Sequence, residues 1–186
     1  MRPARAASED GFSLLELLVV IAIGVVLTAV SLFAVQQTVP EARANSAQRL
    51  VRGLVVYARE EALSSRRSVE MQFLGNQEIR VFRLNLDGTR TELRRNFLEG
   101  NMTYQVYSAL PDTPDAFGRS AAVTFPNSRI LFTSEGAAVD ATGMPVSGTI
   151  FIGRQASTVT ARATTVFGAT GRVAGYRWNG RGWVTL

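Results

Sequence analysis

The feature that most constrains this chain is a run of 24 residues, Phe12 to Val35, in which Glu16 is the only charged residue. As an α-helix the run would be about 36 Å long, enough to cross a hydrocarbon core of about 30 Å. We therefore expect residues 12–35 to form a transmembrane helix. Because Arg2 and Arg5 precede it, the positive-inside rule places the N-terminus in the cytoplasm and the rest of the chain across the membrane.

Two simpler interpretations of this run explain less of it. A secretory signal peptide has an apolar core of about 7 to 15 residues that ends at a small-residue cleavage site, and this run is longer. A plain signal anchor explains the length, but it leaves Glu16 incidental. A charged residue in an apolar helix costs about 2.5 to 3.5 kcal/mol at the membrane centre and less near its end, so we expect Glu16 to have a function.

The composition excludes most enzyme classes. The chain has 186 residues, no histidine, no cysteine and no lysine, so all 20 basic residues are arginine. These absences exclude disulfide scaffolds, thiolate or imidazole metal sites, serine or cysteine triads and catalytic lysines. The carboxylate pairs Glu60/Glu61 and Asp112/Asp115 have no positioning partner at a useful spacing. We therefore expect no catalysis, no metal and no cofactor.

The segment after the apolar run has the pattern of an amphipathic helix. Apolar residues recur at helical spacing at Ala47, Leu50, Val51, Leu54, Ala58 and Ala62. We expect residues 36–64 to continue the first helix and to pack on a core. Pro40 has no backbone N–H to donate, so it predicts a kink or a new helix start between Thr38 and Glu41.

Beyond this helix the period changes to the alternation of β-strands. Val69, Met71 and Phe73 alternate with polar residues, and Asp87-Gly88 and Asn179-Gly180 are hairpin turn signals. We expect residues 65–186 to form one β-rich domain. The predicted fold class is α+β, with a long N-terminal helix, half transmembrane and half amphipathic, packed on an antiparallel sheet of about eight strands.

The sequence GFSLLE at residues 11–16, followed by the apolar helix, resembles the class III leader of type IV pilins and type II secretion pseudopilins. The resemblance implies that residues 1–11 are a leader, which a prepilin peptidase removes by cutting between Gly11 and Phe12. The same enzyme would methylate the new N-terminus of Phe12. The resemblance also implies that Glu16 guides assembly, because its carboxylate can neutralise the Phe12 amine of a neighbouring subunit in a low-dielectric helix bundle.

A long helix followed only by strands is similar to the GspH/FimT family of minor pseudopilins, which have a pilin-like fold. Three segments also resemble family motifs: the Phe-x-x-x-Gly pattern that ends at Gly136, the strand from Gly148, and the segment Gly168 to Val173. The resemblance implies a minor pseudopilin of a type II secretion pseudopilus, a single-pass protein of the bacterial inner membrane with a periplasmic C-terminal domain. Its implied partners are the prepilin peptidase, other major and minor pseudopilins and the inner-membrane assembly platform.

The alternative within the same family is a minor type IV pilin of the FimT type, which contributes to pilus biogenesis or to DNA uptake. Such proteins bind DNA through a C-terminal Gly-Arg-x-Arg motif, and this chain has only the first arginine, Arg172, at that place. Arg177 and Arg181, with Trp178 and Trp183 near them, would complete a basic surface for DNA. The simpler interpretation makes these arginines the solvent-exposed face of a terminal hairpin.

Overall fold

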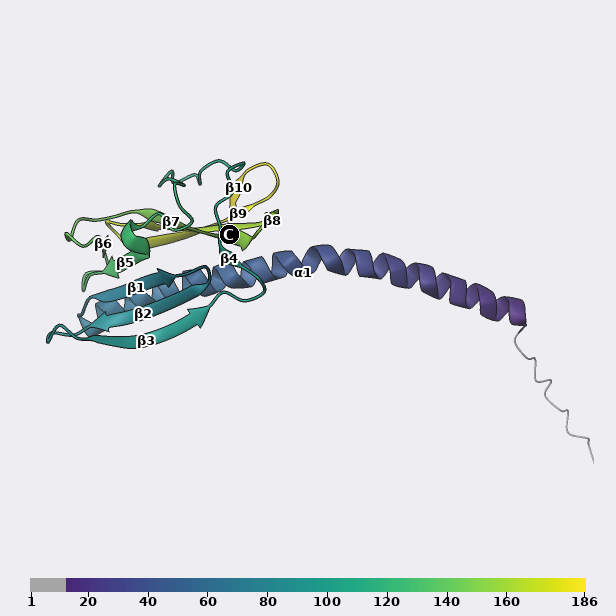
Figure 1. The fold of residues 1–186 in the computed structure, drawn as a ribbon, viewed down its shortest axis with the longest axis horizontal. Coiled ribbons are helices and arrows are strands. Elements are labelled where there is room, and N and C mark those ends of the chain that lie inside the picture. Colours follow the sequence, from purple (N-terminus) through teal and green to yellow (C-terminus); the bar gives the residue numbers. More distant parts are fainter. Residues whose placement is uncertain (1–12) are drawn as a thin grey trace, which may run out of the picture. The chain divides into compact units, whose positions relative to one another are not determined.

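The computed structural model describes residues 13–186, with side chains described for 13–29 and 39–186. One helix, α1, runs from Leu14 to Ser65 over 52 residues (Figure 1). The chain divides between Val39 and Pro40 into two compact units, and each is described here by itself.

In the first unit, the side chains described for residues 13–29 of α1 are predominantly apolar and exposed. The exposed fraction is 83% at Leu14, 57% at Ile21 and 62% at Val26. Within the described residues, no helix combines the length and the hydropathy that a membrane crossing requires.

Of the two effects predicted for Pro40, a kink or a new helix start, the new start does not occur, because α1 continues through this residue. A bend at this point stays a prediction. A proline inside a helix costs about 3 kcal/mol through the lost hydrogen bond and a clash with the preceding turn. The residues that follow offset this cost, since Ala44, Ala47 and Val51 are buried in the core of the second unit.

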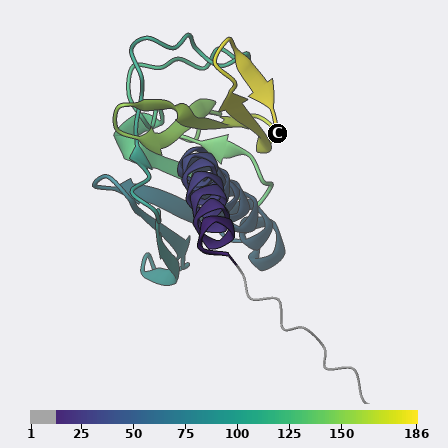
Figure 2. The same cartoon turned by 90° about the vertical axis from the view of Figure 1, so that its right-hand side faces the viewer.

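The second unit contains ten strands in two sheets, so the expectation of about eight strands in one sheet is corrected. Both sheets are antiparallel and five-stranded; their orders are β3-β2-β1-β5-β6 and β10-β9-β8-β7-β4. The strands are β1 (Val69–Leu74), β2 (Glu78–Leu84), β3 (Arg90–Phe97), β4 (Thr103–Tyr104), β5 (Arg129–Phe132), β6 (Ala138–Val139), β7 (Gly148–Arg154), β8 (Ser157–Phe167), β9 (Arg172–Trp178) and β10 (Trp183–Thr185). A short 3-10 turn, η1 (Pro126–Ser128), precedes β5. Figure 2 shows the two sheets as separate layers.

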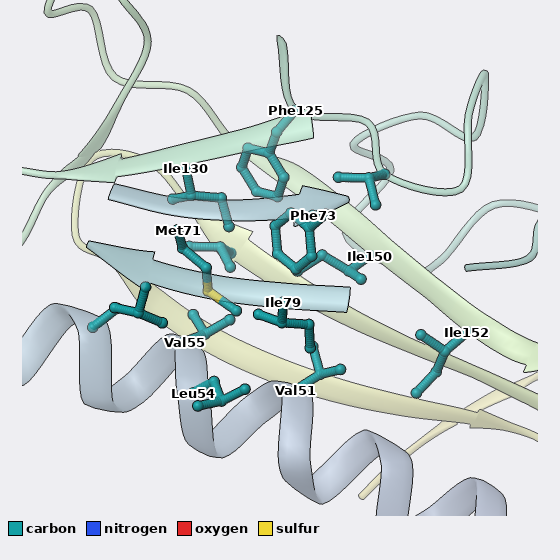
Figure 3. Packing of buried hydrophobic residues seen from close by; sticks show 14 of the residues in the cluster. Val51, Leu54, Val55, Met71, Phe73, Ile79, Phe125, Ile130, Ile150 and Ile152 are labelled. Atoms are coloured by element: carbon teal, nitrogen blue, oxygen red, sulfur yellow. The ribbon is translucent and has the colours of Figure 1, made fainter. Parts of the chain in front are cut away.

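The core lies between the second half of α1 and the two sheets, as Figure 3 shows. The predicted helical stripe is confirmed, since Ala47, Val51, Leu54, Ala58 and Ala62 are all buried. They meet the inward-facing side chains of both sheets, which include Met71, Phe73, Ile79, Ile130, Ile150 and Ile152. One continuous core therefore joins the helix to both sheets within this unit.

Glu70 is a polar residue that alternates with the core-facing residues of β1, yet its side chain is only 7% exposed. Glu70 lies on the face of the sheet opposite to the core, where two arginines cover it. Its Oε2 is 3.2 Å from Nη1 of Arg90 and its Oε1 is 3.2 Å from Nη1 of Arg129. Gln72 also donates to Glu70 Oε1 at 2.8 Å, so the charge is buried with its partners.

Glu78, on the same outer face, makes the stability of this sheet sensitive to acid. Nε of Arg80 and Nε of Arg95 each donate to Glu78 Oε1 at 2.6 Å. The bond from Arg80, helped by that from Arg95, lowers the pKa of the Glu78 carboxyl below its usual value. A carboxyl whose pKa is lowered in the folded state stabilises the fold above its unfolded pKa, and this contribution disappears as the pH falls through the folded value.

We therefore expect the wild-type chain to lose more stability than Glu78→Gln when the pH falls from about 7 to about 3. Urea denaturation of both proteins at the two pH values measures this difference. Asp87→Asn is a useful comparison, because hydrogen bonds from its neighbour Thr89 lower the pKa of Asp87 without an arginine ion pair. Equal acid sensitivity of wild type and Glu78→Gln would show that the arginines do not act through this carboxylate.

Candidate functional site

The first turn of α1 holds Glu16 in a defined position. Ser13 directly precedes the helix, and its Oγ accepts a hydrogen bond from the backbone N–H of Glu16 at 3.2 Å. Its carbonyl oxygen accepts from the N–H of Leu17 at 3.2 Å. Ser13 is therefore the N-cap, and Glu16 stands at the third helical position, where a carboxylate is favoured by the positive end of the helix dipole.

The role of Ser13 escaped the sequence reasoning, although a signal was present. Serine followed three residues later by glutamate, just before an apolar run, is the capping-box pattern. The predicted cleavage and methylation residues, Gly11 and Phe12, lie outside the described residues. Glu16 itself is exposed, as are the apolar side chains that follow it in the first unit. The first turn thus presents one carboxylate at the start of an apolar helix surface.

Two of the motif segments quoted from the sequence meet at one point of the second unit. Gly136 has φ +82° and Gly171 has φ +64°. A Cβ atom on Gly171 would collide with the carbonyl oxygen of Gly136 and would lie 2.6 Å from Nε of Arg59. The same Nε donates to Gly136 O at 3.2 Å. These two glycines thus let the β5–β6 turn and the β8–β9 turn close against α1.

The other motif glycines also allow close packing. A Cβ on Gly168 would lie 2.5 Å from the backbone nitrogen of Val146, and a Cβ on Gly148 would lie 2.8 Å from the ring of Phe125. Both positions require a residue without a side chain. The motif segments of the β-rich unit therefore form its framework.

The three arginines predicted for DNA contact do not form one surface. Arg172 and Arg177 are exposed on β9, but their separation by five positions puts them on opposite faces of the sheet. Nη2 of Arg172 lies 3.8 Å from Oδ1 of Asp115, and Arg177 lies opposite Arg162 of β8. Arg181 is exposed in the turn between β9 and β10, which form the predicted terminal hairpin. DNA contact by these residues stays an untested prediction.

The carboxylate pair Asp112/Asp115 holds a long loop in place. Asp112 accepts from the backbone N–H groups of Thr113 and Gly118, at 2.7 and 2.8 Å. Asp115 Oδ2 accepts from Thr165 Oγ1 at 2.6 Å and from the hydroxyl of Tyr176 at 3.0 Å. The bonds of Asp112 hold the loop's own backbone and those of Asp115 attach the loop to β8 and β9, so both carboxylates have a structural role.

Comparison with known proteins places these features in a family. The sequence model of the prokaryotic N-terminal methylation motif matches residues 7–32, a range that includes Gly11, Phe12 and Glu16. The sequence model of the type II transport protein GspH matches residues 46–171. A comparison with curated protein sequences finds no match.

Similar solved structures include a minor pilin, in two crystal forms, and a minor pseudopilin. The type IV minor pilin FimU of Pseudomonas aeruginosa PAO1, in space group P21, is 20% identical, with a TM-score of 0.49 over 69% of this chain and 84% of FimU. A second crystal form of FimU, in space group P65, gives 20% identity and a TM-score of 0.48 over 69% of this chain and 89% of FimU. The minor pseudopilin EpsH from the type 2 secretion system of Vibrio cholerae is 10% identical, with a TM-score of 0.45 over 77% of this chain and 96% of EpsH.

The two sequence models confirm the resemblance to prepilin leaders and to GspH/FimT pseudopilins. The methylation motif precedes and enters α1, and the GspH match extends from the second half of α1 to the turn before β9. Since the second match covers more than half of the chain, the chain belongs to the family of the type II transport protein GspH.

Proposed function

We propose that this chain is a minor pseudopilin, a structural subunit of a type II secretion pseudopilus. The observation that carries the proposal is the methylation-motif match over residues 7–32, at a helix start where Ser13 fixes the position of Glu16. A prepilin peptidase cuts between Gly11 and Phe12 and methylates Phe12. The mature chain then begins with Phe12, one residue before the N-cap Ser13 in the sequence.

Assembly uses the charge of Glu16 and the apolar surface of the helix. In a bundle of such helices the N-terminal amine of one subunit needs a counter-charge, because an isolated charge in a low-dielectric environment is strongly disfavoured. The carboxylate of Glu16 on a neighbouring subunit supplies it. Their attraction in that environment fixes the axial register between the two helices.

Before assembly, residues 12–35 hold the chain in the bacterial inner membrane and the β-rich unit lies in the periplasm. The described side chains of the first unit support this proposal, since they are predominantly apolar and exposed. The partners are then the prepilin peptidase, the assembly platform and other pseudopilins. This role involves no catalysis. The hydrogen bonds of Asp112 and Asp115 fit a structural role for these two carboxylates.

The test is complementation of a strain that lacks the native gene. We expect the wild-type chain to restore protein secretion, and Glu16→Ala to reduce both secretion and recovery in sheared filaments at least about tenfold, the effect of losing about 1.4 kcal/mol of assembly energy. Glu60→Ala is the matched control, because Glu60 is also an exposed glutamate on α1. Mass spectrometry of the mature chain should find N-methylated Phe12 at its N-terminus.

Three results would contradict the proposal. The first is a mature chain that starts at Met1 in cells with active prepilin peptidase, and the second is normal incorporation of Glu16→Ala. The third is a deletion strain that secretes normally but loses DNA uptake, which would identify the pilus-type alternative.

A further inference from the structure

A cavity of about 260 Å³ lies beside the second half of α1, near the end of the chain. Its lining consists of Asn45, Gln48, Arg49 and Arg52 of α1, together with Leu186, which follows β10. The helical residues repeat at three- and four-residue spacing, so they share one face of the helix. All of them belong to the second unit, and the cavity is separate from the first turn that carries Glu16.

The most buried residue in this lining has an unused hydrogen-bond acceptor. Gln48 is only 3% exposed. Its Nε2 donates to the carbonyl oxygens of Ala163 and Tyr176, at 2.9 and 3.1 Å. Its Oε1 has no hydrogen-bond partner among the described residues. Because a buried acceptor without a partner costs about 1 to 3 kcal/mol, this oxygen favours a ligand that brings an N–H or O–H donor.

The rim of the cavity is positively charged. Arg49 and Arg52 are exposed; Arg49 Nη2 is 3.5 Å from Ser46 Oγ, and Arg52 Nη1 is 3.4 Å from the main-chain oxygen of Leu186, the last residue of the sequence. Within residues 13–29 and 39–186 neither arginine forms an ion pair with an acidic side chain, and no acidic side chain lines the cavity. The rim is therefore complementary to an anionic partner.

The end of β10 adds a backbone edge to this site. The N–H of Leu186 bonds to Gly175 O of β9 at 2.9 Å. In an antiparallel pair, successive residues direct their backbone groups alternately toward and away from the partner strand. Trp183 and Thr185 therefore direct their N–H and C=O groups to the outer edge of β10, which is the last strand of its sheet. An extended segment can pair with such an edge.

We propose that this cavity binds an extended, acidic peptide segment of a partner protein. Carboxylates of the segment pair with Arg49 and Arg52, one of its backbone N–H groups donates to Gln48 Oε1, and its backbone continues along the edge of β10. A nucleic acid fits less well, because a phosphodiester backbone offers acceptors and no donor for Gln48. The site goes beyond the proposed assembly role of Glu16 and does not depend on it.

The probe is a fluorescein-labelled, amidated peptide of eight residues in which valine and glutamate alternate, titrated onto the full chain in detergent micelles. We expect Arg49→Gln/Arg52→Gln to weaken binding at least about tenfold, which corresponds to about 1.4 kcal/mol. Arg43→Gln/Arg154→Gln, which removes two exposed arginines outside the cavity, is expected to change affinity less than about twofold. A benzophenone-bearing version of the peptide should cross-link to residues 45–52 and 183–186.

The outcomes separate this site from general attraction to a basic protein. Arg52→Glu is a second variant with one substitution, and circular dichroism confirms that each variant is folded. Equal binding by wild type and Arg49→Gln/Arg52→Gln would overturn the proposal, as would equal loss in Arg43→Gln/Arg154→Gln. Absence of peptide binding, or tighter binding of a single-stranded oligonucleotide that these substitutions abolish, would also overturn it. Normal peptide binding by Glu16→Ala is expected, so this test and the assembly test fail independently.

Discussion

Gly171→Ala is expected to destabilise the β-rich unit by about 3 kcal/mol or more. Two effects add at this position. An alanine at φ +64° has left-handed backbone strain of about 1 to 2 kcal/mol. Its Cβ would also collide with the carbonyl oxygen of Gly136, a backbone atom that cannot move without displacing the β5–β6 turn. Inserting a methyl group where there is no space typically costs another 1 to 3 kcal/mol.

Gly75→Ala is the matched control for the collision. Gly75 also has a positive φ, +54°, but no atom lies within 4 Å of the position that its Cβ would occupy. We expect it to cost only the strain of about 1 to 2 kcal/mol. Chemical denaturation of the full chain in detergent, followed by tryptophan fluorescence, measures both variants. A Gly171→Ala loss no larger than that of Gly75→Ala would show that the turn moves freely and that the two turns and Arg59 are not tightly packed.

The sequence supports this fold best where a local pattern carries the information. The apolar run and GFSLLE predict the helix start and its carboxylate, and the helical stripe from Ala47 to Ala62 predicts the packed face of α1. The alternation of Val69, Met71 and Phe73 likewise predicts which side of β1 faces the core. Each of these patterns depends on residues a few positions apart, so a periodicity is enough to find it.

The missed features depend on residues that are far apart in the sequence. Glu70 is buried because Arg90 and Arg129 cover it from two other strands, and no pattern within β1 contains that information. The division into two sheets could not be predicted from the sequence for the same reason, since alternation does not reveal which strands pair. β4 and β6, with two residues each, are too short to show a period. Gly171 meets Gly136 only after the pairing of β1 with β5 and of β8 with β9 has been fixed.

Arg162 shows how such long-range placement changes the meaning of a charge. It lies in the segment after Asp140, in which the sequence has arginines and no acidic residue, yet it is only 1% exposed. Its Nε donates to Asn45 Oδ1 at 2.9 Å, and its Nη1 donates to the carbonyl oxygens of Val159 and Ala161 at 3.0 and 2.9 Å. Burial lowers the pKa of Arg162, and the field of Glu41 opposes this shift in part. The guanidinium therefore connects α1 to β8 through neutral acceptors.

Arg162→Ala is accordingly expected to cost about 3 kcal/mol of stability, because it leaves a cavity and removes the donor from three acceptors, of which the Ala161 carbonyl oxygen is buried. Arg177→Ala is the control: this residue lies directly opposite on β9 but is exposed, so we expect a change within about 0.5 kcal/mol. Arg162→Met retains most of the volume and removes the desolvated charge, so it should cost less than Arg162→Ala. The denaturation midpoints of the three variants, compared with that of the wild type, measure these losses of stability. Equal, small losses in Arg162→Ala and Arg177→Ala would mean that the carbonyl groups find water instead, and that packing of Ala44, Val51 and Val55 alone holds α1 to the sheet.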